Sequence, residues 1–190
     1  MLKQSKDYLF IIIISIIYFL FSFVFNDFLS YTMPRHQAVQ LPIIFGIGIA
    51  IASYFKNLNI KELSWAYSAL IFILFSLIFW MLPHSVDLAV INPLIDRTMH
   101  IHILICGILL VASFKTISFE IKTFYLAMLS AKLATVGIVM KVFNILLCGS
   151  FTILQQQETG TYFILFGISL FIYTLFQFFN PSLYRKDLKD

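Results

Sequence analysis

The strongest constraint on this chain is a succession of six apolar runs, each about as long as a bilayer is thick, along its 190 residues. A hydrocarbon core about 30 Å thick needs roughly 20 helical residues, within a range of about 17–25. On that rule we expect membrane-spanning helices over 8–25, 36–55, 63–82, 98–114, 121–148 and 161–179. Strands are not expected, because the runs are continuously apolar and do not alternate with a period of two.

The composition agrees with this interpretation. Hydrophobic residues make up 61% of the chain and charged residues only 12%, whereas a soluble domain has about 25% charged residues. We therefore interpret residues 1–190 as a single integral membrane domain that is all-α, a polytopic bundle of six helices in contact with the lipid bilayer. The basic start and apolar core of the first run are typical of a signal peptide, but no small-x-small cleavage site follows, so we predict a retained helix.

The distribution of lysine and arginine predicts the topology. With six spans, only Arg35 and Arg97 lie on one side of the membrane. The other side collects Lys3, Lys6, Lys56, Lys61, Lys115, Lys122, Arg185, Lys186 and Lys189. The positive-inside rule then places both termini in the cytoplasm of a multi-pass protein of the cell membrane. The cations are scattered singly, which does not favour a nucleic-acid partner.

This topology brings four histidines close to the outer face: His36, His84, His100 and His102. On a helix, Asp96 and His100 share a face at i and i+4, as do Met99 and His102 at i and i+3. His100 and His102 point about 200° apart, so they cannot both face one centre. We favour His100 for the inward position, because Asp96 could orient its second ring nitrogen.

These residue types predict a metal site with His36, His100 and Asp96 as the main ligands. Further candidates are His84, His102 and Met99. Imidazole suits copper, zinc and iron, and thioether sulfur favours Cu(I). Two other interpretations remain open: the histidines are interfacial polar groups that meet lipid headgroups, or His36 and His100 are the axial ligands of haem b.

Two lysines lie inside the fifth run. Lys132 is near its middle, where a charge usually faces the bundle or a cavity, so we expect either a counter-ion or proton-pathway role or hydrogen bonds to neighbouring helices. Lys141 is closer to the outer end and is expected to extend toward the interface. Cys106 and Cys148 both fall in apolar segments, which does not favour a disulfide framework.

No motif in the sequence predicts an enzyme. The chain has no P-loop, no GxGxxG, no HExxH and no nucleophile elbow. We therefore predict no catalytic residue. The segment QQQET at 155–159 is expected to be an outer loop, and the small residues of Gly46-xxx-Ala50 predict a close helix contact.

The stretch from Trp80 to Gly107 contains Trp80, Leu82-Pro83, Leu88-Ala89, Pro93-Leu94, His100 and Gly107 in that order. With these residues it resembles the seven-helix cytochrome c oxidase assembly (CtaG-type) membrane proteins. Their segment reads W-x-L-P, then small and apolar residues, then P-L-x-H-x-x-x-H and a glycine within the helix. Asp96 stands in place of the first histidine. His36 matches an earlier H-x-x-x-H, in which Gln40 replaces the second histidine.

The resemblance covers about a fifth of the chain, and a shorter group of archaeal membrane proteins is similar in length. It implies a metallochaperone that binds copper near the outer face and delivers it to a respiratory oxidase of the respiratory chain. Two alternatives are a non-catalytic accessory subunit of a membrane respiratory complex and a small bis-histidine b-type cytochrome.

Overall fold

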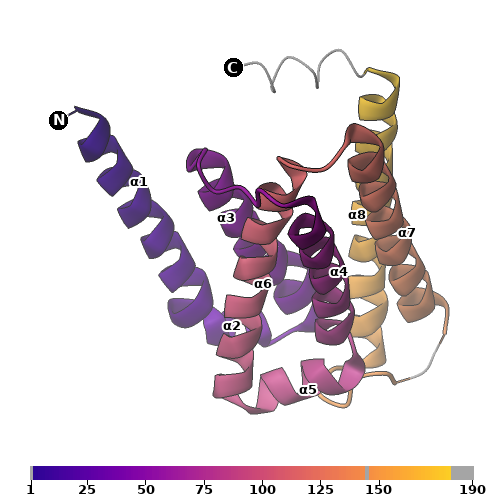
Figure 1. Cartoon of the computed structure of the whole chain (residues 1–190). Coiled ribbons are helices and arrows are strands. Elements are labelled where there is room, and N and C mark those ends of the chain that lie inside the picture. Colours follow the sequence, from indigo (N-terminus) through magenta and orange to yellow (C-terminus); the bar gives the residue numbers. More distant parts are fainter. Residues whose placement is uncertain (1, 144–145, 181–190) are drawn as a thin grey trace. The chain divides into compact units, whose positions relative to one another are not determined.

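The computed structural model describes residues 2–143 and 146–180, which form helices and connecting segments without a strand (Figure 1). The elements are α1 (Leu2–Phe19), η1 (Leu20–Val24), α2 (Asn26–Ser30), η2 (Pro34–Gln40), α3 (Leu41–Tyr54), α4 (Leu63–Trp80), α5 (Pro83–Ile91), α6 (Pro93–Phe114), α7 (Phe119–Val142) and α8 (Ile153–Phe179). The η elements are π-helical. Arg185, Lys186 and Lys189, which contribute to the topology prediction, lie outside the described residues, and the placement of the termini stays a prediction.

Six helical segments are long and apolar enough to cross a membrane, which confirms the all-α, polytopic prediction. They are Asp7–Val24, Pro34–Tyr54, Leu63–Trp80, Pro93–Phe114, Phe119–Val142 and Ile153–Phe179. The fourth begins five residues before the expected start at 98. Pro93 fits at its first position, where a missing N–H costs no hydrogen bond.

The boundaries differ most around the last two spans. Helix α7 ends at Val142, because Phe143 is extended with ψ of 116°, and the expected continuation over 144–145 lies outside the described residues. Lys141 is exposed in the last turn of α7, where a cation interacts favourably with the helix dipole.

Helix α8 begins at Ile153, so QQQET forms its first turns rather than a loop. The Thr152 hydroxyl accepts a hydrogen bond from the Gln155 N–H at 3.3 Å and caps this end.

The connection between the third and fourth spans contains a helix that the sequence interpretation lacked. Leu82 is extended, and α5 begins at Pro83, as expected for the residue before a proline. His84 is exposed on this helix.

The helices form two compact units. Unit 1 contains α1 to α6 together with Cys148–Phe151, and unit 2 contains α7 and α8. The single membrane domain stays a prediction. Unit 1 holds all four histidines.

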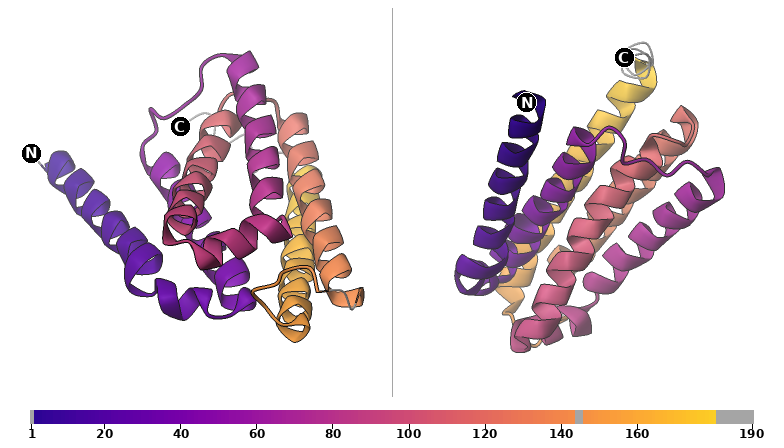
Figure 2. Two further views of the ribbon diagram at one scale, coloured as in Figure 1. Left: turned by 90° about the horizontal axis from the view of Figure 1, so that it is seen from below. Right: turned by 60° about the vertical axis from the view of Figure 1, so that its left-hand side comes forward.

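Helix α6 is the centre of unit 1, in contact with α3, α4 and α5 (Figure 2). The closest approach joins Gly48 of α3 and Gly107 of α6. A Cβ on Gly48 would clash with the Leu104 carbonyl oxygen and would lie only 3.0 Å from the Gly107 Cα. Gly46, by contrast, is exposed and its Cβ would meet nothing within 4 Å. The close helix contact expected at Gly46-xxx-Ala50 is therefore made two residues along, on the face that meets α6.

Unit 2 is a pair of closely packed helices. A Cβ on Gly167 of α8 would lie 2.8 Å from both the Ser130 carbonyl oxygen and the Ala134 nitrogen of α7. Small residues of this kind allow helix backbones to approach in a membrane. The ammonium of Lys132 is buried and has no hydrogen-bond partner within the described ranges. The hydrogen bonds to neighbouring helices that the sequence suggested for Lys132 are therefore not found among the described residues.

Asp87 of α5 fixes the segment Cys148–Phe151 to the rest of unit 1. Its carboxylate oxygens accept hydrogen bonds from the backbone N–H groups of Gly149 at 2.8 Å and Ser150 at 2.9 Å. Partial burial raises the pKa of Asp87, but the hydrogen bonds from Ser150 and Gly149 outweigh it and hold the pKa below its usual value. A carboxyl with a lowered pKa stabilises the fold above its unfolded pKa of about 4, and this contribution is lost as the pH falls through the folded-state pKa.

We expect Asp87→Asn to lower the free energy of unfolding by about 0.5–1 kcal/mol at pH 7, since an amide cannot accept both bonds and solvent screens this partly exposed site. The difference from the original protein should begin to shrink below about pH 4 and should disappear once the pH falls below the lowered folded-state pKa of Asp87. Thermal unfolding in detergent at both pH values measures it. Asp27→Asn, at an exposed acid of α2, is the control and should change little at either pH.

Candidate metal centre

His36 is positioned by the π-helical segment η2. Pro34 opens this segment, and the N–H of Leu41 donates to the His36 carbonyl five residues earlier instead of four. The wider turn of a π-helix is rare and often found at functional sites. It carries His36 and Gln40 into the interior of unit 1, where both side chains are fully buried.

Asp96 and His100 are positioned by the first turns of α6. The side chain of Asn92 caps this helix by accepting a hydrogen bond from the Leu94 N–H at 2.9 Å. Four residues later, Asp96 lies one turn before His100, and their Oδ1 and Nε2 atoms are 3.5 Å apart. The helical spacing of the sequence predicts this shared face.

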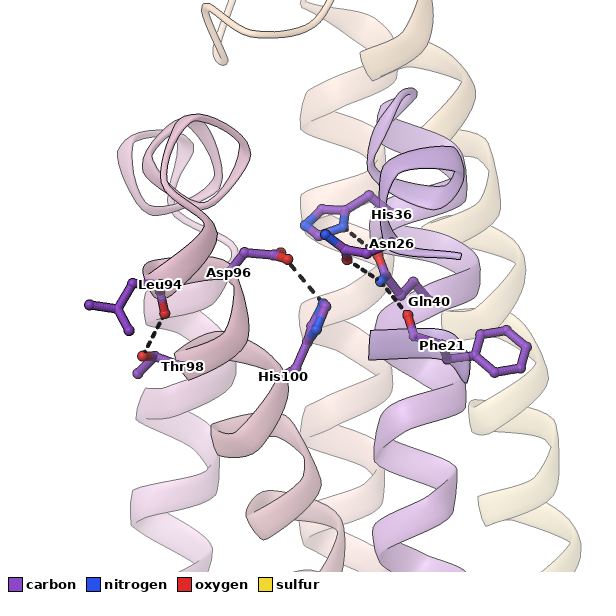
Figure 3. A network of polar contacts seen from close by, with 8 residues as sticks. All are labelled: Phe21, Asn26, His36, Gln40, Leu94, Asp96, Thr98 and His100. Atoms are coloured by element: carbon purple, nitrogen blue, oxygen red, sulfur yellow. Dashed lines mark hydrogen bonds and ion pairs between the residues drawn. The ribbon is translucent and has the colours of Figure 1, made fainter. Parts of the chain in front are cut away.

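The three side chains converge on one point (Figure 3). One ligand atom from each of His36, Asp96 and His100 lies within 4.8 Å of the other two. Their exposed fractions are 0%, 3% and 0%. The ring centroids of His36 and His100 are 6.2 Å apart, with an interplanar angle of 51°. This group could therefore hold a metal ion.

The polar atoms of this group lack ordinary partners. The His36 Nε2, both ring nitrogens of His100 and both carboxylate oxygens of Asp96 are buried without a hydrogen bond to any described residue. Asn26 lies close enough to interact with the Asp96 carboxylate, but without hydrogen-bond geometry. Each unsatisfied buried group costs about 1–3 kcal/mol. A bound cation would take up lone pairs from all three side chains and remove much of this cost.

Arg97, the cation next to Asp96 in sequence, contacts an aromatic ring. Its guanidinium lies over the ring of Phe23, 5.2 Å from the centroid. A cation–π contact of this kind attracts the charge to the ring face. The guanidinium thus has a partner of its own on the ring of Phe23.

The other sequence candidates lie outside this group. His102 is half-buried, with its ring 5.5 Å from Phe72 and 6.0 Å from Trp80. Met99 is fully buried in an apolar cluster with Leu41, Ile44 and Trp80. His84 is exposed on α5, and Lys132 and Lys141 belong to unit 2.

The sequence interpretation missed one polar partner. The Asn26 side chain accepts a hydrogen bond from Gln40 Nε2 at 2.8 Å. The only sequence signal for Asn26 is that it is the first polar residue after the first apolar run. Nothing in its spacing relates it to Gln40, fourteen positions later.

No protein-family model, curated protein or solved structure matches this chain. The function of the buried group is therefore argued from its own geometry and chemistry.

Proposed function

We propose that this polytopic membrane protein binds one copper ion through His36, Asp96 and His100. The observation that carries the proposal is the convergence of three buried ligand atoms within 4.8 Å that lack other partners. A metal held by nitrogen and oxygen ligands lies about 2.0–2.2 Å from each, which places the donors about 3.3–3.8 Å apart in tetrahedral or trigonal geometry. The observed group thus needs to contract by only about 1 Å.

Charge favours copper among the metals that imidazole binds. Two neutral histidines and one carboxylate carry a single negative charge, so Cu(I) gives a neutral complex. A divalent ion leaves a net positive charge in a low-dielectric interior, which is costly unless another anion joins it. Imidazole is a good ligand for copper. Delivery of this copper to a respiratory oxidase is the part of the proposal that depends on the sequence resemblance alone.

Haem b is the second candidate, with His36 and His100 as axial ligands. The position of Asp96 argues against it. Its carboxylate lies within 4.8 Å of ligand nitrogens from both histidines, so it occupies space that a flat macrocycle between the two rings would need. A bare ion needs only the contraction of about 1 Å described above.

Metal titration of the purified protein tests the proposal. We expect one equivalent of Cu(I) to be retained in competition with a chromophoric chelator, and X-ray absorption to show nitrogen and oxygen ligands without sulfur. We expect Zn²⁺ to displace it poorly, because zinc leaves an unbalanced charge. A Soret band would show that the site holds haem and not copper. A colourless protein that loses its copper at once to the chelator would reject metal binding and favour a structural or accessory role.

A further inference from the structure

We infer that Gln40 is a positioning residue that fixes the ring proton of His36 on Nδ1 and so turns the Nε2 lone pair toward Asp96 and His100. The effect of Gln40 on metal binding rests on the proposed function, because it concerns how His36 is oriented as a ligand before the metal binds. The position of the proton itself follows from hydrogen bonds within unit 1.

The orientation of the Gln40 amide is determined by a backbone carbonyl. The Phe21 oxygen lies 2.8 Å from one terminal atom of Gln40, and a carbonyl oxygen only accepts, so that atom must be the amide nitrogen. The same nitrogen donates to Asn26 Oδ1 at 2.8 Å. Both N–H groups of Gln40 are therefore used, and the amide cannot rotate by 180° without losing both bonds.

The remaining atom of the amide determines the tautomer of His36. Gln40 Oε1 lies 2.7 Å from His36 Nδ1. An amide oxygen only accepts, so Nδ1 must carry the hydrogen. In a neutral imidazole the other nitrogen then has the free lone pair. This nitrogen, Nε2, is the buried atom without a hydrogen-bond partner in the described part of the chain, and Figure 3 shows the ring facing Asp96 and His100.

Two π-helical segments make this network possible. In η1 the N–H of Phe25 donates to the Leu20 carbonyl, five residues back, at 2.8 Å. This register leaves the Phe21 carbonyl available to Gln40. Asn26 follows directly, and its side chain lies beside Asp96 as well as Gln40. One network therefore touches two of the three ligands.

The test uses the full-length protein labelled with ¹⁵N at its four histidines. In the metal-free protein, we expect the His36 signal to show a protonated Nδ1 and an unprotonated Nε2, with the signal assigned by its loss in His36→Ala. Gln40→Met removes the acceptor, so the ring should populate both tautomers and Cu(I) affinity should fall about 10–100-fold. Gln40→Glu keeps an oxygen acceptor for His36 Nδ1 and should retain the tautomer and most of the affinity.

Gln37→Met is the matched control, because Gln37 lies in the same π-helical segment and is buried, but its amide nitrogen has no hydrogen-bond partner within the described residues. It should leave the His36 signal and the affinity unchanged. A proton on Nε2 in the unaltered protein, or equal losses of affinity in Gln37→Met and Gln40→Met, would overturn the inference. Failure of the unaltered protein to bind copper would reject the proposed function instead, and the tautomer measured without metal would still decide the role of Gln40.

Discussion

The Gly48→Ala variant is expected to lose about 1–3 kcal/mol of its free energy of unfolding, the usual range for overpacking a tight contact. The added Cβ would fall on the Leu104 carbonyl oxygen and lie 3.0 Å from the Gly107 Cα and the Ile108 nitrogen. All three atoms are backbone, so no side chain can rotate away. Helices α3 and α6 must separate, and thermal unfolding in detergent measures the loss.

Gly46→Ala is the matched control, two residues away on the same helix. Its Cβ meets nothing within 4 Å, and alanine is favoured over glycine in a helix interior by about 1 kcal/mol. We therefore expect opposite signs: stabilisation or no change for Gly46→Ala, and destabilisation for Gly48→Ala. Equal effects at the two positions would mean that helix propensity, not the contact between α3 and α6, determines the outcome.

The same separation should also weaken metal binding. His36 lies in η2, which runs directly into α3, and His100 lies on α6. The distance between α3 and α6 therefore affects the distance between the two ligands. Gly107→Ala adds its Cβ from the opposite side, onto the Phe45 carbonyl oxygen, and should reproduce both losses. The glycine pair thus supports the site as well as the fold.

Much of the fold could be predicted from the sequence, because a bilayer constrains apolar length so strongly. Six spans follow from helical segments of 18 or more predominantly apolar residues. Boundaries were less predictable: apolar content does not show that α7 ends at Val142 or that glutamines open α8. The sequence also does not show which glycine makes the contact with α6, because Gly46 and Gly48 differ only in the neighbours that each faces.

The candidate site was predictable in part. The i, i+4 spacing gives the shared face of Asp96 and His100, and the topology puts His36 at the same end of its helix as His100. The network around Gln40 was not predictable, because it depends on two π-helical registers that have no sequence signature here. Local spacing therefore predicts the pair Asp96 and His100 on α6, whereas the network around Gln40 depends on tertiary contacts.

The largest effect on function is expected from Asp96→Leu, which should change stability in opposite directions with and without copper. Without metal, the variant removes a buried carboxylate whose oxygens lack hydrogen-bond partners in the described structure. Relief of that cost, about 1–3 kcal/mol, exceeds the loss of a favourable charge in the first turn of α6, about 0.3–1 kcal/mol. The metal-free variant should therefore be more stable than the original protein.

With copper the order should reverse. A ligand at 1,000 times its dissociation constant stabilises the folded protein by about 4 kcal/mol, and Asp96→Leu should lose this increment because the complex loses a ligand and its charge balance. His100→Leu should show the same pair of changes, whereas His102→Leu, at a histidine that contacts Phe72 and Trp80, should keep the copper-dependent increment. Thermal unfolding with and without Cu(I) measures both terms. If Asp96→Leu destabilises the metal-free protein and copper still stabilises the variant, the carboxylate is a structural group. If the metal-free variant is more stable and no longer responds to copper, Asp96 lowers the stability of the fold and serves metal binding, as expected for a functional site.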